Sequence, residues 1–349
     1  MSSDLDQQLA AALRRRAGGD VDPTPMVEHA LQHGRRLRRR RRGLLAGAVA
    51  AACVAVTSLV MVVWAGRTGD HPILPATALL LPDASTRAGA LARPGEVGAD
   101  PATVHFTTDP LIGDAEYATW RAGRGTESVE FRGPGGQARF ALARSEVSLN
   151  ELPQTLSSAG TPQPRVDVRV GELPGVAWFD PSGDRKLWFI RWQPADGLWA
   201  QLDAYASTSD EAIGTAGRVR FDVAHRCVVP FRLESLPRQT RPLECSVTLG
   251  RAGRDVFVEG AVVVGDDSGR WLTVRAQRTR ADRGVRPGEL AAGPYRVRRQ
   301  GDDVLEMTVR QCAVEAFRKG WGEGYTEAEG LAILGGYRAA DDLDRPDTW

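Results

Sequence analysis

The chain has 349 residues, with 45 basic and 44 acidic side chains, and its formal net charge is +1 at pH 7. Residues 1–42 carry ten arginines against five acidic residues, so the part of the chain beyond the apolar run that follows is slightly acidic. This balance gives no electrostatic basis for binding nucleic acid, and we expect no nucleic-acid partner.

Residues 1–42 predict a short helical arm. Leu5, Leu9 and Leu13 recur every four residues, which places them on one face of a helix. A second helix is expected to begin near Thr24, which can cap it ahead of Pro25. Because isolated helices of this length are marginal in water, we expect the three leucines to bind a partner, either a cytosolic protein or the membrane surface.

Residues 43–65 predict a single transmembrane helix. The 22 residues from Leu44 to Ala65 carry no charge, and at about 1.5 Å each they can cross a hydrocarbon core of about 30 Å. Arginines crowd the N-terminal flank, which predicts a cytoplasmic N-terminus and an extracytoplasmic C-terminus in a single-pass protein of the cell membrane. The residues that set this topology are Arg38, Arg39, Arg40, Arg41 and Arg42.

A cleaved signal peptide and a lipid attached at Cys53 are the alternatives to a retained anchor. The apolar run is longer than a signal peptide needs, and 42 residues precede it. Both features favour an anchor that stays in the membrane.

Residues 66–101 predict a linker, because they are rich in Ala, Pro, Gly and Thr and show little periodicity. From Ala102 onward, short alternating runs such as ESVEFRG and KLWFIRW predict antiparallel strands with one buried face. Trp188, Ile190 and Trp192 alternate along one of these runs. We interpret them as core residues under a helix rather than as a stacking platform for sugars.

The predicted fold class is α+β: a single transmembrane helix and a β-rich ectodomain of two similar halves, each made of antiparallel strands plus a C-terminal helix. The halves are residues 102–224 and 225–349. A shift of 118 positions aligns TSDEAIGTAG with TEAEGLAILG. Thr208 and Thr326 head these segments, and a glutamate follows each by three residues, as in a capping box. One continuous β-rich domain is the alternative.

Three of the four cysteines, Cys227, Cys245 and Cys312, lie in the predicted exported part, where disulfides can persist. No CxxC spacing occurs, which argues against a structural zinc site. Cys227 with Cys245 is the favoured pair, because both adjoin strand-like runs that could close a hairpin-like loop. The pairs of either residue with Cys312 remain open.

The sequence contains no GxSxG, HExxH or phosphate-loop motif, and the histidines beyond residue 65 have no serine or cysteine arrangement typical of nucleophilic catalysis. We therefore expect a protein that is not an enzyme and that carries no cofactor or metal.

The order of parts resembles the actinobacterial single-pass membrane proteins of anti-sigma-factor-like layout. It consists of LDQQLAAALRRRA, then VDPTP, an arginine run, one span and an exported β-rich domain. LWFIRWQPADGLWAQLDAYASTSDEAIGTAGRV is similar to the ending of domains of unknown function on sigma-factor regulators, and residues 230–247 resemble the opening of the same domains. Those domains are related in shape to lipoprotein-carrier folds. One departure is that His29 is followed by His33 and by no cysteine, whereas zinc-type anti-sigma factors have a His-x3-Cys-x2-Cys motif.

The resemblance implies a bitopic bacterial membrane protein that acts as a regulator or sensor of anti-sigma-like type. Its cytoplasmic helices would hold a sigma factor or another regulator, and its ectodomain would read a signal. The alternative is a membrane-anchored extracytoplasmic binding module for an unknown envelope ligand, with no regulatory cytoplasmic role.

Overall fold

The computed structural model describes residues 79–349 except 152–163, 182–185, 253–254, 279–288, 302 and 319–323, and this part is called the sheet domain below. The predicted arm with Leu5, Leu9 and Leu13, the arginines 38–42 and the predicted span 43–65 lie outside the described residues. Within the described residues, no helix has the length and apolarity needed to cross a membrane.

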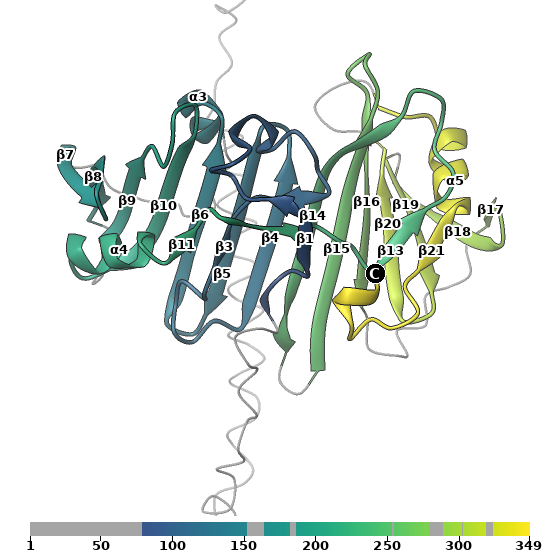
Figure 1. Ribbon diagram of the computed structural model, residues 1–349. Helices are drawn as coiled ribbons and strands as arrows, with labels where there is room; N and C mark the ends of the chain where they lie inside the picture. Colours follow the sequence, from purple (N-terminus) through teal and green to yellow (C-terminus); the bar gives the residue numbers. More distant parts are fainter. Residues whose placement is uncertain are drawn as a thin grey trace, which may run out of the picture. The chain divides into compact units, whose positions relative to one another are not determined.

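One antiparallel sheet of 14 strands organises the sheet domain (Figure 1). In order across the sheet, its strands are β17 (Leu290–Ala292), β18 (Tyr295–Gln300), β19 (Val304–Val309), β20 (Cys312–Phe317), β16 (Trp271–Arg278), β15 (Asp255–Gly265), β14 (Arg241–Ala252), β4 (Tyr117–Gly123), β5 (Thr126–Gly133), β6 (Gly136–Ala143), β10 (Trp199–Ala206), β9 (Lys186–Trp192), β8 (Leu173–Asp180) and β7 (Val166–Val170).

Smaller elements surround this sheet. The described helices are α3 (Glu146–Asn150), α4 (Ser209–Ala216), α5 (Glu327–Gly335) and the 3-10 turns η2 (Pro94–Glu96) and η3 (Pro346–Thr348). The short strands are β1 (Asp83–Ala88), β12 (Val223–Arg226) and β2 (Thr103–Val104) in one sheet, and the pairs β3 (Thr107–Thr108) with β11 (Val219–Arg220) and β13 (Phe231–Leu233) with β21 (Tyr337–Ala339).

Two apolar clusters pack on the same face of the main sheet. The first includes Trp120 and Cys245, and the second is built around residues such as Leu272 and Leu305. Cys245 lies directly opposite Val262, which packs against the second cluster. Since directly opposite residues project from one face, the apolar face continues from the first cluster to the second.

The predicted α+β fold of two similar halves is wrong. The described chain is mostly strand, and β14 of the expected second half pairs along seven residues with β4 of the expected first half. This pairing sets Val247 opposite Trp120. The alternation of apolar residues shows which face of a strand is buried, but it does not show which strand lies beside it.

The helix starts behave as the local sequence predicts, with one difference. At α5, Thr326 Oγ1 accepts a hydrogen bond from Glu329 N at 3.3 Å and Thr326 N donates to Glu329 Oε2 at 2.8 Å, which completes the capping box. At α4, Thr208 Oγ1 caps Glu211 N at 3.2 Å, but the Glu211 carboxylate accepts from the backbone of Ser207. The caps therefore mark where helices begin and carry no information about the pairing of strands.

The structure also tests the predicted core of β9 and the predicted linker. Trp188, Ile190 and Trp192 of β9 are buried in the first cluster, which confirms their interpretation as core. Strand β1, by contrast, lies inside the range 66–101 that was expected to be a linker, and it pairs with β12. That part of the range packs as a component of the sheet domain.

Candidate functional site

A disulfide joins Cys227 to Cys245, with an S–S distance of 1.99 Å and a Cα–Cα distance of 6.2 Å. It links the segment after β12 to β14, and both residues are buried in the first cluster. This is the pairing that the sequence favoured. Cys312 is a buried free thiol, and burial raises its pKa, so it has little thiolate character at neutral pH.

A buried polar pair stabilises the segment before β3. The Glu127 carboxylate of β5 is fully buried and accepts hydrogen bonds from Gly98 N at 2.8 Å and His105 N at 2.6 Å. The His105 ring also contacts it, with Nδ1 2.6 Å from Glu127 Oε1. A buried carboxylate held by three such contacts is a structural anchor, because its hydrogen-bonding capacity is taken up by the protein itself.

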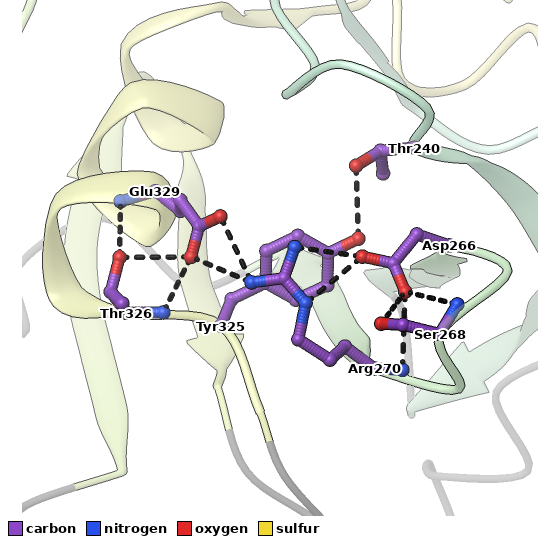
Figure 2. A network of polar contacts seen from close by, with 7 residues as sticks. All are labelled: Thr240, Asp266, Ser268, Arg270, Tyr325, Thr326 and Glu329. Atoms are coloured by element: carbon purple, nitrogen blue, oxygen red, sulfur yellow. Dashed lines mark hydrogen bonds and ion pairs between the residues drawn. The ribbon is translucent and has the colours of Figure 1, made fainter.

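Arg270 is the centre of a second polar network, between the β15–β16 turn and the start of α5 (Figure 2). Its guanidinium donates to Asp266 Oδ2 at 2.9 Å and to Glu329 Oε1 at 3.1 Å, and it lies 4.7 Å from the ring centroid of Tyr325. The Tyr325 hydroxyl in turn contacts Thr240 Oγ1 at 2.9 Å.

The acids of this network are held in their ionised form. Hydrogen bonds from the Ser268 hydroxyl and from Arg270 hold the pKa of Asp266 below its ordinary value. Partial burial acts to raise the pKa of Glu329, but hydrogen bonds from Thr326 and Arg270 outweigh it and lower that pKa. Since each charge already has a partner, the network is a clamp between two parts of the fold and not a binding site.

On the opposite face of the main sheet, the middle strands carry rows of polar side chains, and these rows hold the candidate site. Directly opposite residues form rows across β4, β5, β6 and β10: Thr119 with Glu130, Arg139 and Asp203 in one row, and Arg121 with Ser128 in the next. This row pattern follows from strands such as TESVEFRG, in which apolar and polar residues alternate.

A cavity of about 360 Å³ opens on this face. Its floor consists of β4, β5 and β6 side chains, including Arg121, Ser128 and Arg139, and Ser148 and Glu151 at α3 form one wall. Arg124 lies on the tight turn between β4 and β5 and completes the lining with Glu244 of β14. The volume lies within the range of small-molecule sites.

Buried charges fix the wall of this cavity. Arg191 of β9 donates from Nη1 to Glu146 at 2.6 Å and from Nη2 to Asn150 at 2.9 Å, and both acceptors are on α3. Arg139 Nε donates to Asp203 Oδ2 at 2.9 Å underneath. Burial raises the pKa of Asp203, and the neighbouring Arg139 only partly offsets that rise. The two Arg191 contacts hold α3, which has only five residues, against the sheet.

The remaining lining charges differ in whether they are paired. Glu130 accepts from Gln137 Nε2 at 2.9 Å and from the Arg132 guanidinium. Arg124 lies 3.7 Å from Glu244. Within the described part of the chain, the guanidinium of half-buried Arg121 and the carboxylate of exposed Glu151 make no hydrogen bond or ion pair. The cavity therefore offers one cationic and one anionic group to a ligand.

Sequence reasoning did not find this cavity. Arg121 and Glu151 lie thirty positions apart in ordinary strand and loop contexts, and neither belongs to a motif. The one available signal was the row of charged residues on the polar face of adjacent strands. For metals, the structure brings no three His, Cys, Asp or Glu side chains close enough to bind an ion anywhere among the described residues.

Comparison with known proteins gives no family. No family model matches the chain, and no curated protein matches it. Solved structures similar to it include MucB in complex with MucA(peri), at 12% identity and a TM-score of 0.23, covering 67% of this chain and 96% of that one. MucB alone is similar at 11% identity and a TM-score of 0.22, covering 71% of this chain and 96% of that one. TM-scores this low do not establish a shared fold, so no property of MucB is carried over to this chain.

Proposed function

We propose that this protein is a single-pass bacterial membrane regulator, with a cytoplasmic N-terminal arm and an extracytoplasmic sheet domain that reads a signal. The observation that carries the proposal is the disulfide between Cys227 and Cys245, because such bonds persist in oxidising compartments and are rare in the cytosol. The apolar run 43–65 behind Arg38 to Arg42 supports a span with its N-terminus inside.

The arm, residues 1–42, is proposed to hold a sigma factor or another cytoplasmic regulator through Leu5, Leu9 and Leu13. An apolar helix face of this size gains stability only when a partner covers it. The protein's role in this proposal is binding and signalling without catalysis or a cofactor.

A second candidate is a membrane-anchored binding module whose arm serves only to set topology. The cavity beside Arg121 favours it, because ligand capture at that site requires no cytoplasmic partner. The two candidates share the same topology and differ in whether the arm binds a protein.

Topology is tested with the full-length chain fused at its C-terminus to alkaline phosphatase, which is active only outside the cytoplasm. We expect activity from the fusion and its loss when Arg38 to Arg42 are replaced by glutamine and an equal arginine cluster is placed after residue 66. An inactive wild-type fusion would reject both candidates.

The arm is tested by purifying full-length tagged protein from solubilised membranes and identifying bound proteins by mass spectrometry. Leu9→Asp places a charge on the apolar face, and Gln7→Asp places the same charge on the opposite face as a matched control. Recovery of one regulator with wild type and Gln7→Asp, but not with Leu9→Asp, supports the regulator. Identical recovery from all three proteins favours the binding module.

A further inference from the structure

We infer that the cavity between β4, β5, β6 and α3 binds a small zwitterion, an amino acid or short peptide, with its carboxylate on Arg121 and its ammonium on Glu151. The inference rests on the proposed function, because the ligand would be the signal that the sheet domain reads. Binding itself can be measured without a cytoplasmic partner, so the two can fail separately.

The cationic end of the site is Arg121. Its side chain rises from β4 on the polar face, directly opposite the buried Ser128 of β5, and both line the cavity. Residues opposite each other in an antiparallel pair have Cβ atoms about 5 Å apart, and the hydroxyl of Ser128 is a second polar donor to the same cavity. A planar guanidinium beside a hydroxyl suits a carboxylate, which can accept from both.

The anionic end is Glu151, the residue that follows α3. Its backbone N–H closes the helix by donating to Val147 O at 3.2 Å, which fixes where its side chain begins. Because Arg191 ties α3 to the sheet from the buried side, this wall keeps its position over the floor. A carboxylate carried at the rim of a polar cavity by an anchored helix is a partner for an ammonium group.

The charge balance of the lining favours a zwitterion over a polyanion. The cavity is lined by three arginines and three glutamates, namely Arg121, Arg124, Arg139, Glu130, Glu151 and Glu244. Arg139, Arg124 and two of the glutamates already contact partners within the fold. A polyanion would face the three carboxylates, whereas a ligand with one charge of each sign meets the two groups left over.

The test uses full-length protein in detergent and three dipeptide probes measured by isothermal titration calorimetry. Alanyl-alanine carries both charges, its N-acetylated form carries only the carboxylate, and its C-terminal amide carries only the ammonium. We expect alanyl-alanine to bind, and each single-charge analogue to bind about tenfold more weakly or worse, since a charged hydrogen bond is lost.

The variants locate each charge. The Arg121→Gln protein should bind alanyl-alanine about tenfold more weakly than wild type and should bind it no better than the amide. The Glu151→Gln protein should bind alanyl-alanine no better than the acetylated form. Arg296→Gln, an exposed strand arginine on β18 with no ion pair among the described residues, is the matched control and should bind like wild type.

Three results would overturn the inference: no heat of binding with alanyl-alanine at millimolar concentration, equal affinity for all three probes, or unchanged discrimination in the Arg121→Gln protein. The analogues act on the wild-type chain, so the test stands even where a variant folds poorly. Failure here leaves the topology and capture experiments untouched, and failure of those leaves the calorimetry interpretable.

Discussion

Removing the disulfide should destabilise the sheet domain by a predictable amount. The bond joins Cys227 to Cys245 across a sequence separation of 18. In the chain-entropy model, a loop of that length lowers the entropy of the unfolded chain enough to contribute about 3 kcal/mol at 25 °C. A domain is usually stable by only about 5–15 kcal/mol, so this is a large share of the total.

The assay is urea unfolding of the full-length protein in detergent, followed by tryptophan fluorescence. The chain has nine tryptophans, and Trp120 is buried in the same cluster as both cysteines, so the combined emission includes this region. We expect the double variant Cys227→Ala, Cys245→Ala to lose about 3 kcal/mol, plus about 1 kcal/mol for the two buried sulfur atoms. Adding dithiothreitol should shift wild type by a similar amount and leave the double variant unchanged.

Cys312→Ala is the control, because it removes a buried sulfur without removing a bond. It should cost no more than about 1 kcal/mol and should keep the response to dithiothreitol. The reasoning is refuted if the double variant loses less than about 1 kcal/mol, or if dithiothreitol destabilises it as much as it destabilises wild type.

Three further predictions concern the same fold. Arg270→Gln should lower the thermal midpoint more than Arg296→Gln does, because Arg270, unlike Arg296, connects the β15–β16 turn to α5; equal midpoints would contradict the clamp. Thr326→Ala removes the α5 cap and should cost about 1 kcal/mol in urea unfolding, and no loss would show that the cap is dispensable. Burial lowers the pKa of His225 below its ordinary 6.5, so the stability that neutral His225 gives is fully present above pH 6.5 and falls as the pH drops through the lowered pKa. His225→Gln should flatten the stability curve below pH 6.5, and an unchanged slope would assign it to other groups.

The sequence predicted the elements whose signals are local. The alternation in KLWFIRW identified β9 and its buried tryptophans, and the Thr326 to Glu329 spacing located the start of α5. Strand β1 was missed because Asp83–Ala88 shows no apolar alternation: only one of its six residues is buried. Its place is set by pairing with β12, which is more than 130 positions further along the chain.

The strand order and the cavity depend on long-range packing, which no local pattern records. Strands β4 and β14 both alternate, and nothing in either pattern indicates that Trp120 will face Val247. Arg121 and Glu151 come together only because α3 folds back over the polar face of β6 and β10. Recognition of the cavity therefore required the completed sheet.

The pairing of β4 with β14 also has a consequence for the time course of synthesis. Trp120 and Val247 lie 127 positions apart (247 − 120), so a ribosome adding about 5–20 residues per second makes β14 about 6–25 s after β4. Throughout that interval one side of β4 is an open edge, whose unpaired N–H and C=O groups can recruit a strand of another chain. Expressing residues 102–224 alone would make the interval permanent, so that fragment should aggregate, whereas residues 79–349, in which β14 covers β4 and β15 in turn covers β14, should stay soluble.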